Sequence, residues 1–368
     1  MNRRRSLAQL ITCLRGELPV TPDWRAILTM ANRALVTAQL YEALARTGAV
    51  QSLPDNVHGF LREVSERNRE RNRRLARQLG EALQALNNAN IEPILLKGAA
   101  VWASSGCGLD FNRIFSDLDL LVNPMEVERA LDALVESGFP VLRYSGKGSH
   151  AVATLGRPTD VGVIDLHQRP PGPLGIAQIQ DVDFLCTRIS WFGGRARVPV
   201  PAIQILVLVL HDQFHDGDYW RGGFDLRHLI DIAELSRAPQ PVDWLMLDAL
   251  CKTSLVRNAL GTQLLAVEQF LGAAMPPVFT GGRWVRFQHQ RHMWQFAYPG
   301  FSASLAVVGI VSEWRNLRAH RTLNEIHWRE ALGLKTEAAG PMLGRAASNV
   351  LTRVRRLRRF FSPRVGKL

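Results

Sequence analysis

Apolar side chains recur every three or four positions through roughly the first 90 residues, which is the spacing of amphipathic helices. The opening segment, "MNRRRSLAQLITCLRGELPV", predicts one such helix. Residues 24–48 predict a second helix, which ends near Gly48, and a third spans about residues 57–89. The third helix carries an arginine-rich face that also contains glutamates, so we interpret it as solvated surface rather than as a nucleic-acid patch.

Between residues 91 and 200 the pattern changes to short apolar runs separated by turns. Helices are predicted over "AAVWASS" and over "PMEVERALDALVESG", which Pro124 opens. A hairpin is predicted with its turn at Gly193 and Gly194. The remaining predicted strands are "IEPILL", "DLDLLV", "FPVLRYS", "HAVATLG" and "DVGVIDLH". This mixture predicts an α+β fold, in which a small mixed β-sheet is flanked by N-terminal and C-terminal helical regions.

From residue 201 onward the apolar spacing is helical again, beginning with "AIQILVLVLHDQFHD" and "FDLRHLIDIAELS". The last segment predicts a strongly basic amphipathic helix that ends at Pro363. We therefore expect four parts: an N-terminal helical region (1–90), a sheet core (91–200), a C-terminal helical domain (201–340) and a basic tail (341–368).

The charge balance is basic, with 45 Lys and Arg against 33 Asp and Glu and a formal net charge of +12. This balance favours polyanionic partners. The basic tail could contact RNA, an anionic membrane surface or a partner protein, although a solvated helix is the default expectation. No apolar run approaches the roughly 20 residues of a membrane-spanning helix, and the N-terminus lacks a clean signal-peptide core. The four cysteines are scattered without a Cys-x-x-Cys pair, so we expect buried thiols in a cytoplasmic protein.

Two aspartates one residue apart, Asp117 and Asp119, begin the predicted strand "DLDLLV". Side chains alternate along a strand, so both carboxylates share one face, where they repel each other unless a cation lies between them. Mg²⁺ prefers such hard oxygen ligands. Upstream, a predicted buried strand leads into Lys97 and Gly98 at the start of a helix, an arrangement that suits phosphate binding.

A third carboxylate, Asp165, lies on a later predicted strand with His167 on the same face. A carboxylate on a neighbouring strand would complete a site for two metal ions. We expect His167 to position an acceptor, to pair with Asp165, or to serve only as a structural hydrogen-bonding partner. Arg113 and Ser116, just before the aspartate pair, are candidates for phosphate contacts, although Arg113 could equally screen the carboxylates.

His211 and His215 lie four residues apart on one predicted helix face. That spacing suits zinc, but the sequence offers no obvious third ligand. On a later helix, Arg227 and Asp231 are also four apart, which predicts an ion pair along that helix.

Taken in order, these motifs resemble the uncharacterised nucleotidyltransferase family of the polymerase-β-type superfamily. The resemblance covers residues 91–236 through "LLKG", "RIFSDLDLLV", "IDLH", "HDQFH" and "LRHLIDIAEL". It implies a minimal mixed sheet, a glycine-containing turn that holds a triphosphate, and three carboxylates that bind two Mg²⁺ ions. It also implies that His211 and His215 line the substrate side of the cleft or brace the following helix.

Position by position, the resemblance assigns the turn to Gly98 and the carboxylates to Asp117, Asp119 and Asp165. The superfamily's turn usually has Ser or Gly after its glycine, whereas Ala99 follows here. The hydroxyl contact to phosphate is therefore missing, and Lys97 or backbone amides would replace it.

The function expected from the sequence is Mg²⁺-dependent transfer of a nucleoside monophosphate from an NTP, with ATP as the expected donor, to a small molecule, sugar or peptide. Two alternatives stay open. One is modification of RNA or protein by a toxin-type nucleotidyltransferase. The other is a catalytically silent nucleotide-binding module, against which the three intact aspartates argue.

Overall fold

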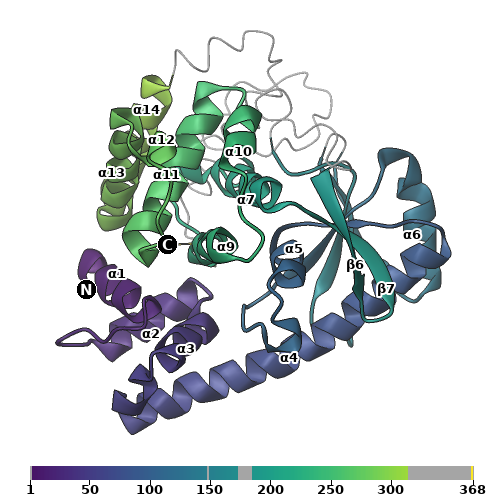
Figure 1. The fold of residues 1–368 in the computed structure, drawn as a ribbon, viewed down its shortest axis with the longest axis horizontal. Helices are drawn as coiled ribbons and strands as arrows, with labels where there is room; N and C mark the ends of the chain where they lie inside the picture. The colour runs from purple at the N-terminus through teal and green to yellow at the C-terminus, as the bar shows by residue number, and fades with distance from the viewer. Residues whose placement is uncertain (1, 147–148, 173–184, 314–365, 368) are drawn as a thin grey trace, which may run out of the picture.

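The computed structural model describes residues 2–146, 149–172, 185–313 and 366–367 of the chain (Figure 1). A seven-stranded sheet forms the centre of one half, and helices from both ends of the sequence make up the other half. The long helix α4 (Asp55–Asn88) runs from the N-terminal helices to the sheet and to the helix α6 beside it. The predicted α+β class, a mixed sheet with flanking helical regions, is confirmed.

The sheet has the strand order β3-β4-β5-β2-β1-β7-β6. β2 pairs in parallel with β5, and β1 with β7, whereas the other neighbours are antiparallel. All the predicted strands are present. Their bounds are β1 (Ile94–Leu95), β2 (Asp117–Leu121), β3 (Val141–Tyr144), β4 (Ala151–Leu155), β5 (Val163–His167), β6 (Cys186–Trp191) and β7 (Gly194–Pro199).

The β6–β7 hairpin differs from its prediction by one residue. Its turn is Phe192–Gly193, with φ values of +45° and +79°, and Trp191 pairs directly with Gly194. Two successive positive φ angles are typical of the two-residue turns whose twist matches antiparallel strands. Gly194 therefore belongs to β7, where an added Cβ would lie 2.4 Å from Cβ of Leu83 on α4.

The N-terminal region begins with α1 (Arg3–Leu14), as predicted. The single helix predicted over residues 24–48 is wrong. It is two helices, α2 (Trp24–Arg33) and α3 (Thr37–Arg46), followed by the short turn η1 (Ala49–Ser52). The break lies at Leu35, whose backbone is left-handed with φ of +56°, a conformation that ends a right-handed helix.

Helix α4 confirms the third predicted helix, and its arginine-rich face is solvated. Arg67 pairs with Glu63 and Arg73 with Glu70 along the exposed surface. The opposite face is buried and carries asparagines that hold the loop before β2. Asn72 Nδ2 donates to the carbonyl oxygens of Phe111 (2.8 Å) and Arg113 (2.9 Å), and Asn68 Nδ2 also donates to Arg113 O (3.2 Å). The helix therefore fixes where β2 begins.

The sheet region contains helix α5 (Lys97–Ser104) and helix α6 (Val127–Glu136), with the short turns η2 (Gly108–Asp110) and η3 (Pro124–Glu126). The C-terminal helical part packs against α5 and β7 through α7. Its elements are α7 (Pro201–Leu210), the π-helical turn η5 (His211–His215), α8 (Asp218–Arg221), α9 (Leu226–Arg237), α10 (Trp244–Leu250), α11 (Ser254–Leu271), α12 (Pro277–Thr280), α13 (Arg283–Ala297), η6 (Pro299–Phe301) and α14 (Ser302–Ser312).

Most of the predicted basic tail, including its end at Pro363, lies outside the described residues. Within the described ranges, no single helix is long and apolar enough to cross a membrane. By length and composition alone, the bent pair Arg283–Ala297 and Pro299–Ser312 passes the same criterion when taken together, with a bend of 118°.

Candidate active site

Three aspartates converge on neighbouring strands. Asp117 and Asp119 lie on β2, and the parallel register of β5 places Asp165 directly beside Asp119. One carboxylate oxygen from each of the three lies within 4.8 Å of the others. Asp119 is buried, with 2% of its surface exposed, and the other two are partly buried. The structure thus brings together the three carboxylates that the strand pattern singled out.

A lysine ammonium lies among these carboxylates. Lys97 Nζ is 2.6 Å from Asp119 Oδ1. Burial opposes the charge on Lys97, but Asp119, with smaller contributions from Asp117 and Asp165, raises the pKa of the ammonium above its ordinary value. The carboxylates therefore generate a potential that holds a cation in a buried position.

The three carboxylates differ in how strongly they hold a proton. Burial disfavours the charge on Asp119, but Lys97 and a hydrogen bond from His167 outweigh it and lower the pKa of that carboxyl. Burial and the charges of Asp119 and Asp117 raise the pKa of Asp165, against a 2.7 Å hydrogen bond from Thr154 Oγ1. A cluster of hard oxygen ligands with excess negative charge suits a divalent cation such as Mg²⁺.

His167 contacts a different aspartate from the one the sequence proposed. Its Nε2 is 2.9 Å from Asp119 Oδ1, and no hydrogen bond joins it to Asp165 among the described residues. Of the three alternatives for His167, pairing with Asp165 is therefore wrong, and the bond to Asp119 agrees with a hydrogen-bonding partner. The two side chains belong to one strand, whereas the hydrogen bond crosses from β5 to β2.

Arg113 forms an ion pair that the sequence did not suggest. Its guanidinium binds the carboxylate of Asp231 on α9, with Nε 3.0 Å from Oδ1 and Nη2 2.9 Å from Oδ2. Both side chains are buried. The predicted pairing of Asp231 with Arg227 is wrong, because Arg227 binds Asp225, the residue that caps α9, with Nη2 2.8 Å from Oδ2.

Gly98 and Ser116 lie at the same site. Ser116 Oγ donates to Asp117 Oδ1 at 2.9 Å. An added Cβ at Gly98 would lie 2.5 Å from Nη1 of Arg113, so only glycine allows the start of α5 to approach that guanidinium so closely. The contact of Ser116 or Arg113 with phosphate stays a prediction.

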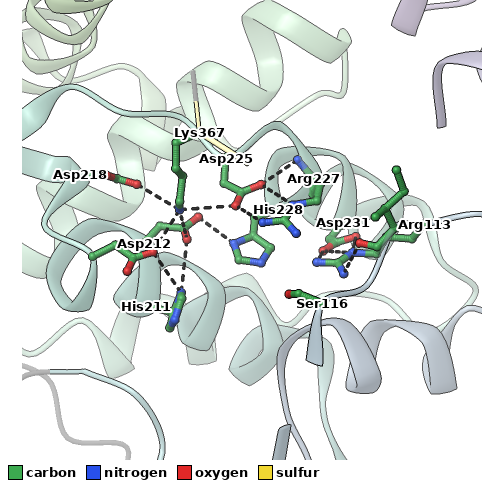
Figure 2. Close-up of polar contacts among 12 residues, drawn as sticks. Arg113, Ser116, His211, Asp212, Asp218, Asp225, Arg227, His228, Asp231 and Lys367 are labelled. Atoms are coloured by element: carbon green, nitrogen blue, oxygen red, sulfur yellow. Dashed lines mark hydrogen bonds and ion pairs between the residues drawn. The ribbon is translucent and has the colours of Figure 1, made fainter. Parts of the chain in front are cut away.

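His211 and His215 lie on the π-helical turn η5, next to further acidic residues. A ligand atom of Asp216 lies within 4.8 Å of both histidines, and one of His228 lies equally close to His211 and Asp212. Sequence spacing missed His228, because this residue belongs to α9 and is brought to η5 only by folding. Figure 2 shows a second acidic group here, with Lys367 among Asp212, Asp218 and Asp225.

One cavity of about 240 Å³ lies between the aspartates of β2 and the acidic group around Lys367. Residues of the sheet region form one wall and residues of the C-terminal helical part form the other. The first wall comprises Lys97, Gly98, Arg113, Ser116, Asp117 and Asp119, and the second comprises His211, Asp216, Asp225, Arg227, His228 and Lys367. A larger cavity of about 780 Å³ lies on the other side of Arg113, between the N-terminal helices and α9.

Comparison with known families gives a match to the family described as "Uncharacterised nucleotidyltransferase" over residues 21–272, which is more than half of the chain. No curated protein matches.

Two solved structures are similar to parts of this chain. One is the solution structure of the antibiotic-resistance factor ANT(2'')-Ia, with 13% sequence identity, coverage of 53% of this chain and 95% of that chain, and a TM-score of 0.34. The other is an antigenic nucleotidyltransferase-like protein from Paracoccidioides brasiliensis, with 19% identity, coverage of 56% and 97%, and a TM-score of 0.35.

Proposed function

Because the chain belongs to the uncharacterised nucleotidyltransferase family, as its motifs predicted, we propose that it transfers a nucleoside monophosphate from an NTP, with ATP as the expected donor, to a small molecule, sugar or peptide. The accepting group is a hydroxyl or a phosphate. The observation that carries this proposal is the convergence of Asp117, Asp119 and Asp165 within 4.8 Å on two paired strands.

The donor set fits Mg²⁺. Three carboxylates face one another, and the ammonium of Lys97 already lies among them, 2.6 Å from Asp119. Asp117, Asp119 and Asp165 would hold two Mg²⁺ ions, which would lower the pKa of the acceptor hydroxyl and offset the charge on the triphosphate. Lys97 can then turn from Asp119 toward the phosphates.

The remaining residues bind and orient the substrates. Gly98 lets the backbone at the start of α5 approach the triphosphate, and the ammonium of Lys97 neutralises part of its charge. The hydrogen bond from His167 fixes the orientation of the Asp119 carboxylate. Asp165 is the carboxylate expected nearest to the acceptor.

In the proposed reaction, an acceptor oxygen attacks the α-phosphorus of the NTP and gives up its proton to the carboxylate of Asp165, the group expected nearest to it. A bond forms between that oxygen and phosphorus, and the bond to the bridging oxygen breaks, so pyrophosphate leaves. The protein forms no covalent bond to either substrate in this reaction. Positioning of the two substrates and stabilisation of the charge in the transition state supply most of the acceleration.

The test is label transfer from α-³²P-labelled NTPs with Mg²⁺, in separate incubations with cellular RNA, with a small-molecule extract and with the protein alone. We expect label in the small-molecule fraction. Label in RNA or in protein would support the RNA- or protein-modifying alternative instead. Absence of label from every fraction would contradict the enzymatic proposal and favour the silent module.

Aspartate variants assign the activity to this site. Asp119→Asn and Asp165→Asn should each lower transfer by about 10²–10³-fold or more, because each removes a carboxylate that would hold Mg²⁺ beside the reacting phosphate. Asp132→Asn, at an exposed position on α6, is the matched control and should retain the natural rate. Full activity in either site variant, with folding confirmed by circular dichroism, would contradict the assignment.

A further inference from the structure

Four aspartates surround one buried lysine across the cavity from the proposed catalytic carboxylates. Lys367 Nζ lies 2.7 Å from Asp212, 3.0 Å from Asp218 and 3.4 Å from Asp225, the three aspartates around it in Figure 2. It also lies 3.3 Å from Asp216, and each distance is measured to a carboxylate oxygen. The lysine side chain is 10% exposed. We call these four aspartates the ammonium cluster.

The ammonium cluster is built from three separate elements. Asp212 lies on η5, Asp218 begins α8, and Asp225 caps α9. Buried carboxylates that converge from separate elements repel one another and cost free energy unless a cation lies between them. An alkylammonium, with three N–H donors on one nitrogen, matches several acceptors around a point.

The aspartates of the cluster differ in how far they depend on Lys367 for a cationic partner. Asp212 also contacts His228 Nδ1 at 2.8 Å, and Asp225 contacts Arg227. For Asp218, Lys367 is the one cationic partner among the described residues. The cluster is thus an ammonium site that is filled, in this structure, by the chain's own side chain.

The position of the cluster distinguishes it from an ordinary interior ion pair. Lys367, Asp216 and Asp225 line the same cavity as Asp117 and Asp119. A group bound in place of the Lys367 ammonium would therefore belong to a molecule that also reaches the proposed catalytic carboxylates.

Resting on the proposed function, we propose that the ammonium cluster is the acceptor-binding subsite, that the acceptor is a small molecule with a primary ammonium group, and that Lys367 occupies its place in this structure. The cavity of about 240 Å³ is smaller than the roughly 300–1,000 Å³ pockets of drug-sized ligands, so we expect the bound part of the acceptor to be small. The ammonium would anchor the acceptor while a separate hydroxyl or phosphate of the same molecule receives the nucleotide.

A backbone hydrogen bond holds the chain beside the cluster. The N–H of Gly366, the neighbour of Lys367, donates to the carbonyl oxygen of Arg33, at the end of α2, with a distance of 2.9 Å. An acceptor would compete with the Lys367 side chain, so removing the lysine should make the subsite easier to fill.

The first experiment measures binding without any nucleotide. Lys367→Met should bind n-butylammonium, measured by calorimetry and by the rise in melting temperature, at least tenfold more tightly than the natural chain does. The neutral isostere n-butanol should give no saturable effect with either protein. Lys252→Met, at an exposed lysine, is the matched control and should behave like the natural chain.

Three outcomes would overturn the proposal. In the first, n-butylammonium and n-butanol have the same effect. In the second, the Lys367→Met variant and the natural chain bind the amine equally tightly. In the third, Zn²⁺ binds the variant and the amine does not displace it. If Lys367→Met does not fold, Lys367→Gln, which is one atom shorter and neutral but keeps a hydrogen-bond donor, takes its place in the same measurements.

The second experiment separates this proposal from the nucleotidyltransferase proposal. The small-molecule extract is treated with N-hydroxysuccinimidyl acetate, which blocks primary amines, before the label-transfer assay. We expect the treated extract to lose at least nine-tenths of its acceptor activity. Undiminished transfer would overturn the ammonium subsite and leave the nucleotidyltransferase intact, whereas Asp119→Asn should abolish transfer but keep amine binding.

Discussion

Lys97 combines an unusual backbone conformation with a central place in the proposed active site. Its φ is +47°, in the left-handed region that costs a non-glycine residue roughly 1 kcal/mol. Its ammonium pairs with buried Asp119 at 2.6 Å. Strained backbone of this kind concentrates at functional sites, where the surrounding structure over-determines the geometry. The strain therefore coincides with the turn proposed to bind the triphosphate.

Glu234, on α9 beside the larger cavity, predicts a pH dependence of stability. Burial, followed by the charge of Asp231, raises the pKa of its carboxyl from 4.5 to about 7. Between these values the folded protein keeps a proton that the unfolded chain has lost. The free energy of unfolding should therefore fall, by up to about 3 kcal/mol from this group, as the pH rises through this window. Above the window this group should cause no further change.

Urea denaturation of the natural chain and of Glu234→Gln, at about pH 5 and about pH 8, measures this contribution. The variant should lose less stability between the two pH values than the natural chain. Glu136→Gln, at an exposed position on α6, should follow the natural chain. Equal losses in the natural chain and in Glu234→Gln would contradict the prediction.

The ion pair between Arg113 and Asp231 joins two elements, the loop before β2 and helix α9. The Asp231 carboxylate is fully buried, so Arg113→Met would leave it without its cation. We expect a loss of about 3–5 kcal/mol in the free energy of unfolding. The double variant Arg113→Met/Asp231→Leu should recover most of that loss, because an apolar pair can replace a buried ion pair.

Denaturation curves of the single and double variants test this prediction. Arg67→Met removes an exposed ion pair with Glu63 on α4 and is the control, with an expected change under about 1 kcal/mol. A single Arg113→Met variant as stable as the control would show that the pair contributes little to joining β2 and α9.

Element types and the three carboxylates were predictable because they depend on local patterns. Alternation along β2 places Asp117 and Asp119 on one face, whatever the rest of the chain does. The break at Leu35 was not predictable, because neither glycine nor proline marks it and tertiary packing selects its left-handed backbone. The hairpin turn was displaced for a similar reason, since Phe192 adopts a positive φ that two adjacent glycines would be expected to supply.

Apart from His211, which the family resemblance placed on the substrate side, the second wall of the cavity could not be predicted, because its contacts join distant parts of the sequence. Lys367 and Asp212 are 155 residues apart, and Arg113 and Asp231 are 118 apart. Charge patterning along a helix favoured the local pair Arg227–Asp231 instead. The fold selects partners by three-dimensional position, so Asp231 pairs with Arg113 from the loop before β2.

The cavity lies between the sheet region and the C-terminal helical part, so a nucleotide bound there should stabilise the whole molecule. Residues of α5 and β2 form one wall, and residues of η5 and α9 form the other. A ligand that binds only the folded state adds about 2.7 kcal/mol to the free energy of unfolding at 100 times its dissociation constant. Thermal unfolding with Mg²⁺ and a non-hydrolysable ATP analogue should therefore show a higher melting temperature than with Mg²⁺ alone. Asp119→Asn should lose this increase and Asp132→Asn should keep it, whereas an equal increase in both variants would place the nucleotide elsewhere on the protein.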